Sequence, residues 1–379
     1  MKRDWAYLEA AALDLILNKL KERINHVSFS VVCRNWCSVA KLNHQNQQFR
    51  TNVLPMLMIP TKRSLYGIPG NKVYLPSSLS LPLPLISNKK ICGSSHGWLA
   101  LMEDGKYDIT LINPFKNVAP IVLPPLNPLA EFYENNVNKV VLSVDPLTDP
   151  NDYMVAAIRN DHSCFAIIRA GQKNWTHVED DDDDLDCYYT DITFYKGLAY
   201  VACRMDDIVS FNLHYLDDPS GRERIVPNIF YEDNYHLTNH VSDRGYLVKS
   251  LEGDLWIVRR ILDIQLNSDV RDIVIERFDV YKLELDAQNG EVLQTLKLEN
   301  LGDNVLFVGD CDSTAVSSSY FSNCLQKDSI YYTNDYDDGL PSTYLHDPFD
   351  LRVKEGRFIQ HCPFNPLSPT FWILPPFQF

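Results

Sequence analysis

The chain has 379 residues, 45% of them hydrophobic and 22% charged, a composition typical of folded globular proteins and unlike that of disordered chains. Its net charge of −15 repels phosphate backbones and anionic membrane surfaces, so we expect neither a nucleic-acid partner nor membrane association. No apolar run approaches the roughly 18 residues of a membrane-spanning helix.

The nine cysteines are odd in number and irregularly spaced, which does not suit a disulfide framework. The N-terminus begins with charged residues, and no small-residue cleavage site follows an apolar stretch, so we expect no secretory signal. Both features favour a reducing compartment, which is the nucleus and/or the cytoplasm.

The first fifty residues show helical periodicity. The apolar positions at three- and four-residue spacing predict an amphipathic helix over residues 8–24; they are Leu13, Ile16, Leu17, Leu20 and Ile24. A second short apolar group spans residues 27–32. A further helix is predicted by residues that share one helical face, namely Val32, Trp36, Val39 and Ala40. The segment is thus predicted to contain three short helices.

From residue 55 onward, prolines recur too often for a long helix to persist, and short β-branched and aromatic runs alternate with turn signals. This change predicts a helical module over residues 1–48 and an all-β domain over residues 49–379. The predicted strands cover residues 98–102, 140–144, 153–158, 165–169, 198–202, 255–259, 279–285, 305–308 and 330–333.

Two stretches of the β domain share a pattern in which a glycine precedes a strand that leads through a polar turn into a second strand. Residues 97–101 with 109–113 correspond in this way to residues 197–201 with 208–212. A weak repeat over roughly 300 residues is typical of a β-propeller, whose blades run to about 40–50 residues each. The sequence leaves six or seven blades open.

The segment Gly93-Ser94-Ser95-His96-Gly97 matches the Gly-x-Ser-x-Gly pattern of a hydrolase nucleophile elbow. An elbow requires a strand before the serine and a helix after it. Here a strand-like run follows, so we interpret the segment as a turn that enters a blade strand.

Other candidate sites are weaker. The acidic run from Glu179 to Asp184 lacks the alternating ligands and the glycine of a calcium loop, and we interpret it as a solvated loop. Cys33 and Cys37 lack the second ligand pair of a zinc site. No spacing identifies a catalytic pair. We therefore predict no catalytic residue, cofactor or metal, and no enzymatic activity.

The N-terminal pattern consists of Asp4-Trp5-x-x-Leu8, Leu13-Asp14-Leu15-Ile16-Leu17-x-x-Leu20 and Phe29-Ser30-x-Val32-Cys33-Arg34-x-Trp36-x-Ser38-Val39-Ala40. This pattern resembles the F-box of plant F-box proteins. The chain departs from the usual F-box in having Leu8-Glu9 where Leu-Pro is common, and alanine at position 12. The resemblance implies binding to a Skp-type adaptor, which connects through a cullin to the ubiquitin-conjugating machinery.

The remainder contains several recognisable segments, among them Cys92-Gly93-Ser94-Ser95-His96-Gly97-Trp98-Leu99, Ile121-Val122-Leu123-Pro124-Pro125, Gly171-x-x-x-Trp175-Thr176 and Asp191-Ile192-x-Phe194-Tyr195-Lys196-Gly197. With these segments it resembles the KIB-like β-propeller family of plant F-box proteins. The two resemblances together cover nearly the whole chain. They imply a mostly β protein in which a short three-helix F-box precedes a β-propeller-like domain.

The implied function is that of a substrate-recognition subunit of an SCF-type ubiquitin ligase, with a protein substrate held by the propeller. An adaptor of this kind acts by proximity and needs no catalytic group. The residues expected to contact the adaptor are Leu8, Leu13, Ile16, Leu20, Val32, Cys33 and Trp36. Two alternatives stay open, a propeller hydrolase with a helical packing segment and an adaptor-bound module that does not cause degradation.

Overall fold

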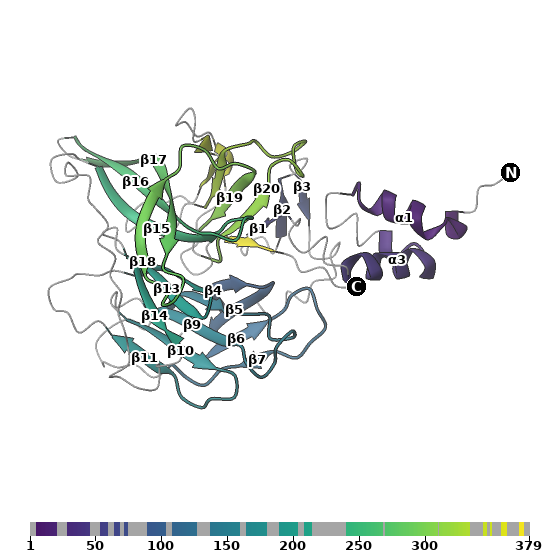
Figure 1. Cartoon of the computed structure of the whole chain (residues 1–379), viewed down its shortest axis with the longest axis horizontal. Helices are drawn as coiled ribbons and strands as arrows, with labels where there is room; N and C mark the ends of the chain where they lie inside the picture. The colour runs from purple at the N-terminus through teal and green to yellow at the C-terminus, as the bar shows by residue number, and fades with distance from the viewer. Residues whose placement is uncertain are drawn as a thin grey trace.

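The structure is a computed structural model. It describes residues 5–20, 29–45, 54–59, 64–68, 72–74, 89–103, 108–126, 137–159, 164–179, 189–203, 208–213, 240–267, 270–309, 311–333, 344–346, 349–350, 358–361 and 371–374. Figure 1 shows two parts, a group of β-sheets and, apart from them, the helices of the N-terminal segment. In the described part, no helix is both long and apolar enough to cross a membrane.

The helical part contains the 3-10 turn η1 (Trp5–Tyr7), α1 (Ala10–Leu17) and α3 (Arg34–Gln45), and residues 29 and 30 are also helical. The prediction that the first helix continues to residue 24 is wrong at its C-terminal end. The helix ends at Asn18, whose side chain donates to Asp14, and the amides of Lys19 and Leu20 bond in tighter turns to residues three positions earlier. Residues 21–28 lie outside the described part.

Six sheets of three or four strands make up the blades. Blade 1 contains β25 (Phe371–Ile373), β1 (Met56–Ile59), β2 (Ser64–Gly67) and β3 (Lys72–Tyr74); blade 2 contains β4 (Lys89–Ser95), β5 (Trp98–Glu103), β6 (Ile109–Ile112) and β7 (Ile121–Val122); blade 3 contains β8 (Val137–Leu142), β9 (Met154–Arg159), β10 (Cys164–Arg169) and β11 (Thr176–Glu179).

Blade 4 contains β12 (Tyr189–Tyr195), β13 (Leu198–Cys203) and β14 (Ile208–Asn212); blade 5 contains β15 (His240–Lys249), β16 (Leu255–Asn267), β17 (Val270–Leu285) and β18 (Val292–Lys297); blade 6 contains β20 (Thr314–Ser317), β19 (Asn304–Val308), β21 (Ser329–Tyr332) and β23 (Phe349–Asp350). A separate two-stranded sheet pairs β22 (Tyr344–His346) with β24 (Phe358–His361).

The blades close into a ring. Six buried hydrophobic clusters each join one neighbouring pair of blades, including the pair formed by blades 6 and 1, where Phe307 packs with Leu57 and Trp372. The closing blade combines both ends of the domain, because β25 pairs with β1 through Leu57 opposite Trp372. Among the described residues the ring therefore has six blades, which decides between the six and seven that the sequence left open.

The two stretches with the shared glycine pattern are equivalent in the structure, as predicted. β4 and β5 join through His96 and Gly97 (φ 51° and 78°), and β12 and β13 join through Lys196 and Gly197 (φ 48° and 83°). Two consecutive residues with positive φ define the turn that matches the twist of paired strands. Each hairpin then continues into a third strand of its blade.

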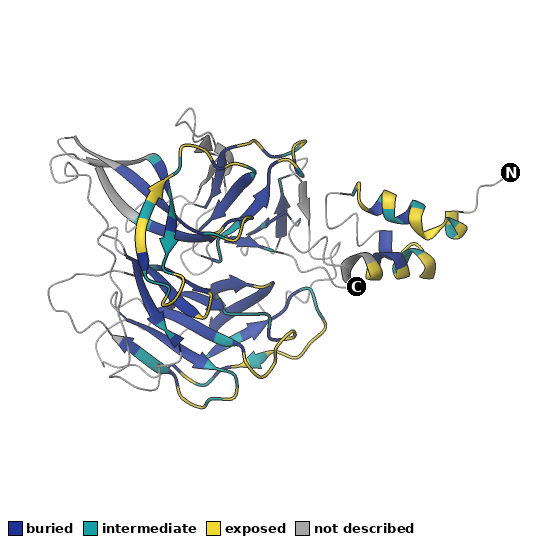
Figure 2. Ribbon diagram, viewed as in Figure 1, coloured by how far each residue is buried: buried dark blue, intermediate teal, exposed yellow. Residues whose placement is uncertain are grey.

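The predicted strands are present, with differences at their ends. The strand expected over 140–144 spans Val137–Leu142, because the hydroxyl of Ser143 accepts the amide of Met154 and the chain turns there. The strands expected over 255–259 and 279–285 are much longer and pair along Leu255–Asn267 and Val270–Leu285. Figure 2 shows that the sheets are mostly buried, whereas α1 and α3 carry exposed faces.

Candidate functional site

The N-terminal helices have a small core of their own. Five fully or nearly buried side chains form it, namely Leu13, Leu17, Phe29, Val39 and Ala40. The ring of Trp36 lies 4.5 Å from that of Phe29, and its indole N–H donates to the carbonyl of Trp5 at 3.0 Å. Asn35 holds the same segment through a bond of 3.0 Å to the carbonyl of Leu8. The segment before α1 is thereby fixed against α3.

The seven residues expected at the adaptor surface fall into three groups. Leu8, Ile16, Leu20 and Trp36 are half-buried and pack against the helical core. Val32 is exposed and Cys33 is half-buried in the turn before α3. Leu13 has 0% of its surface exposed, so in this structure it packs the helices together and offers no surface to a partner. We therefore assign Leu13 to the core of the module.

The structure adds exposed apolar residues to Val32, which the periodicity had already selected. Eleven large hydrophobic side chains are exposed among the described residues, and six of them lie in the N-terminal helical part. These six, which we call the exposed apolar set, are Trp5, Tyr7, Leu15, Val31, Val32 and Leu42. Leu15 lies off the apolar stripe of α1 and is 65% exposed. The sequence signal that could have identified Leu15 is an apolar residue on the polar face of an amphipathic helix.

The Gly-x-Ser-x-Gly segment has a structural role. It occupies the end of β4 and a hairpin that leads into β5, so no helix follows Ser95. The hydroxyl of Ser95 donates to the Asp312 carboxylate at 3.2 Å. A Cβ at Gly93 would lie 2.2 Å from the carbonyl oxygen of Val140 in the next blade, so only glycine permits this contact. The interpretation as a turn into a blade strand is confirmed for His96 and Gly97, whereas Gly93–Ser95 belong to strand β4 and not to the turn.

Charged groups meet at the buried inner strands. The ammonium of Lys139 lies 2.5 Å from the Asp191 carboxylate and donates to the carbonyl of Cys311 at 2.8 Å. Burial alone would lower the pKa of Lys139, but the Asp191 carboxylate raises it. Burial raises the pKa of Asp191, although the Lys139 ammonium and the amides of Leu247 and Ile192 oppose that shift. The group links blades 3, 4 and 5 to the β19–β20 connection.

That connection also reaches blade 2, because the amide of Asp312 donates to the carbonyl of Ser94 at 3.1 Å. At this position Lys139 and Asp191 are paired with each other, and the Asp312 carboxylate accepts the hydroxyl of Ser95. Within the described ranges, no three histidine, cysteine, aspartate or glutamate side chains gather as metal ligands would. The acidic run beyond Glu179 lies outside the described residues.

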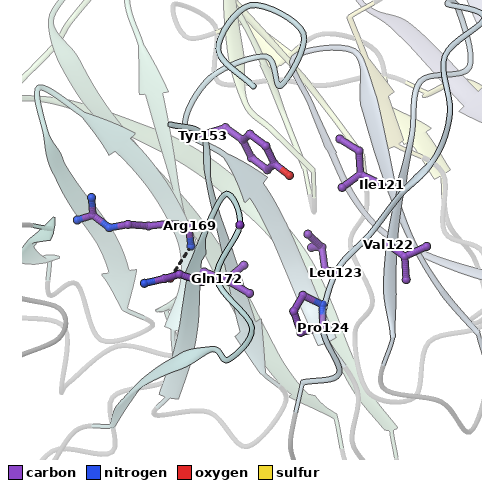
Figure 3. A pocket seen from close by; sticks show the side chains of 9 residues that line it. Ile121, Val122, Leu123, Pro124, Tyr153, Arg169 and Gln172 are labelled. Atoms are coloured by element: carbon purple, nitrogen blue, oxygen red, sulfur yellow. Dashed lines mark hydrogen bonds between the residues drawn. The ribbon is translucent and has the colours of Figure 1, made fainter. Parts of the chain in front are cut away.

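A cleft with a volume of about 340 Å³ lies between blades 2 and 3. One wall consists of Ile121–Pro124, and the other is made by Tyr153, Ile168, Arg169 and the turn at Gly171 and Gln172. Figure 3 shows how the labelled side chains from the two walls face each other. The indole N–H of Trp175 joins the walls by a bond of 2.8 Å to the carbonyl of Pro124.

Comparison with known families decides the membership of this chain. The family model described as "KIB1-4 beta-propeller" matches residues 64–356, which is most of the β domain. The chain belongs to the KIB1-4 β-propeller family. The match extends from β2 to a point beyond β23, so it includes the strands of all six blades except β1 and the closing strand β25.

The similarity to relatives in this family also covers the N-terminal helices. Two Arabidopsis thaliana proteins named as candidate F-box proteins, At5g55150 and At3g25750, are each 24% identical to it. The first alignment covers 98% of this chain and 97% of the relative, and the second covers 88% of each. The chain is thus similar to plant proteins with F-box names along nearly its full length.

Solved structures show more distant likeness. The β-propeller domain of Cps50 (Swd1) from Myceliophteria thermophila has a TM-score of 0.34 and 10% identity, covering 69% of this chain and 66% of that one. The α-L-arabinanase of Penicillium chrysogenum has a TM-score of 0.33 and 10% identity, covering 74% and 86%. At scores this low, neither likeness carries an argument about function.

Proposed function

We propose that this protein is the substrate-recognition subunit of an SCF-type ubiquitin ligase. Its N-terminal helices would dock on a Skp-type adaptor, which a cullin scaffold joins to the ubiquitin-conjugating enzyme. The propeller would hold a protein substrate. We place the boundary between these parts after residue 48; α3 ends at Gln45 and β1 begins at Met56, which supports that position. We place the protein in the nucleus or the cytoplasm.

The observation that carries the proposal is the exposed apolar set on the helices. More than half of the exposed large hydrophobic side chains of the described residues belong to a segment of fewer than fifty residues. Exposed apolar side chains concentrated in one short segment mark an interaction site, because burying them against a partner removes apolar surface from water. The F-box names of the relatives give the class of partner.

The geometry of the helices also supports docking by a preformed surface. The indole N–H of Trp36 donates to the carbonyl of Trp5, and the side-chain amide of Asn35 donates to the carbonyls of Ala6 and Leu8. These bonds hold Trp5 and Tyr7 in place while leaving both side chains exposed. A surface that is ordered before binding loses less conformational entropy when the partner arrives.

The proposal can be tested in cells that express the tagged full chain while the proteasome is blocked. We expect the wild-type chain to capture a Skp-type adaptor, a cullin and ubiquitinated substrate. The double variant Leu15→Ser/Val31→Ser should lose all three. The matched control is Leu147→Ser/Leu293→Ser, which removes two exposed apolar side chains from the propeller and should keep the adaptor and the cullin.

The outcomes separate the readings of the N-terminal segment. If the wild-type chain captures no adaptor, the proposal fails. If it captures the adaptor and the cullin but no captured protein is ubiquitinated or accumulates when the proteasome is blocked, the ligase role fails and an adaptor-bound module that does not cause degradation replaces it.

A further inference from the structure

The cleft between blades 2 and 3 contains a polar group that has no hydrogen-bond partner among the described residues. Tyr153 as a residue is 8% exposed, and Figure 3 shows its hydroxyl directed into the space between the two walls, toward Ile121. Among the described residues, none forms a hydrogen bond with this hydroxyl. Burial raises the pKa of Tyr153, so the group is a neutral donor. The hydroxyl is open to the cleft, so it can donate a hydrogen bond to a ligand atom placed there.

One wall of the cleft is the outer edge of blade 2. The amide of Leu123 donates to the carbonyl of Ile109, so these two residues, just beyond the paired residues of β6 and β7, meet as a hydrogen-bonded pair. Because such pairs alternate in antiparallel strands, the N–H and C=O of Val122 point away from β6. Val122 is 68% exposed, and no hydrogen bond within the described part of the chain uses its backbone.

The side chains that face into the cleft are uncharged. Figure 3 shows the guanidinium of Arg169 directed away from it, and this group donates to the carbonyl of Leu213. The carbonyl oxygen of the Gln172 side chain accepts the amide of Arg169, which fixes the turn at Gly171. Ile121, Leu123 and Ile168 supply an apolar lining. The chemistry therefore suits an uncharged apolar group beside an extended backbone.

We propose that the substrate binds here as an extended peptide that adds a strand to the outer edge of blade 2. The N–H and C=O of Val122 would bond to the peptide backbone, as in other complexes formed by strand addition. An apolar peptide side chain would enter the cleft, and the Tyr153 hydroxyl would donate to a peptide carbonyl. This inference rests on the proposed function, because it names the substrate site of the same propeller.

A phage-displayed library of random linear twelve-residue peptides, selected on the immobilised full chain, provides the probe. We expect enrichment of peptides with a central apolar residue. The enriched peptides, synthesised and titrated by fluorescence anisotropy, should bind Val122→Pro at least tenfold more weakly, since proline removes the outward N–H. Tyr153→Phe should weaken binding about fivefold by removing the hydroxyl alone.

Two controls isolate the site. Val122→Ala keeps the backbone N–H and should bind the peptides within about threefold of the wild-type affinity. Bound peptide should also slow amide hydrogen exchange over residues 121–124 in the wild-type chain. The inference is overturned if no peptide is enriched, or if Val122→Pro and Tyr153→Phe bind the enriched peptides as well as the wild type does.

Adaptor capture by the same variants separates this inference from the proposed function. Val122→Pro and Tyr153→Phe should bind a Skp-type adaptor as the wild type does, because neither residue belongs to the helices. Normal adaptor capture with unchanged peptide binding refutes only the cleft. Loss of adaptor capture by the wild-type chain refutes the ligase role and leaves the peptide measurement to decide the cleft alone.

Discussion

The ammonium of Lys139 lies 2.5 Å from the carboxylate of Asp191, and the two side chains are 4% and 1% exposed. Lys139 belongs to β8 and Asp191 to β12, so the ion pair joins the innermost strands of blades 3 and 4. The Asp191 carboxylate also accepts the amide of Leu247 from β15 in blade 5. The pair therefore fixes three consecutive blades around one point.

Replacing Lys139 alone should be severe. Lys139→Met leaves the Asp191 carboxylate buried without its cation, and we expect a loss of about 3–5 kcal/mol in the free energy of unfolding. The double variant Lys139→Met/Asp191→Asn removes both charges of the buried pair, so it should be more stable than Lys139→Met. Urea denaturation of the three proteins measures both differences. A single variant as stable as the wild type would contradict this role.

Stability at acid pH should depend on Asp145. Burial would raise the pKa of this carboxyl, but hydrogen bonds from the amide of Leu147, the indole of Trp98 and the ammonium of Lys116 hold it below its ordinary value of 3.8. Because the folded pKa is the lower one, the ionised group stabilises the fold above the unfolded pKa. That contribution is lost as the pH falls through the folded pKa.

Urea denaturation between about pH 6 and about pH 3 tests this dependence. Asp145→Asn should be less stable than the wild type at the upper end of the range, and the difference should shrink toward the lower end. Asp149→Asn, which changes an exposed aspartate in the same turn, should follow the wild-type profile. A constant difference between Asp145→Asn and the wild type would disagree with the lowered pKa.

Two glycine substitutions should differ in cost. Gly93→Ala places a Cβ 2.2 Å from the Val140 carbonyl oxygen, so the inner strands β4 and β8 must separate. We expect a loss of more than ~3 kcal/mol, at the upper end for overpacked sites. Gly197→Ala meets no atom within 4 Å and costs only the strain of φ +83°, roughly 1–2 kcal/mol. Thermal unfolding ranks the two, and the reverse order would refute the contact.

Leu13 and Leu15 should respond differently although they are two positions apart on α1. Leu13→Ala removes a fully buried side chain from the helical core and should destabilise the helices by about 2–5 kcal/mol. Leu15→Ala changes an exposed side chain and should alter stability by less than about 0.5 kcal/mol. Amide hydrogen exchange over α1 and α3 reports both. Equal protection in the two variants would contradict the assignment of Leu13.

The elements of the propeller were predictable where local signals define them. Two strands, Trp98–Glu103 and Leu198–Cys203, each follow a glycine with positive φ and contain residues that favour strands. The sequence therefore indicates both the turn and the strand. The pairing of Leu57 with Trp372 joins residues more than 300 positions apart. No local pattern in the sequence specifies a contact at that separation. Because this contact closes the ring, the number of blades could not be predicted from the sequence.

The candidate sites were predictable only in part. Helical spacing identifies the stripe that contains Leu13, but the same spacing describes a residue packed inside the module and one presented to a partner. Exposure distinguishes them, and it depends on the position of α3. Likewise, neither Val122 nor Tyr153 is unusual in the sequence. Their significance comes from the juxtaposition of blades 2 and 3, which only the folded chain provides.

The most direct test of the account is the affinity of the purified full chain for a Skp-type adaptor, measured by isothermal titration calorimetry with the wild type and Leu15→Ser/Val31→Ser. The account predicts one adaptor per chain for the wild type and at least a tenfold weaker complex for the variant, whose helices should keep their amide protection. No binding by the wild type, or equal affinity of a folded variant, would contradict adaptor docking through the exposed apolar set.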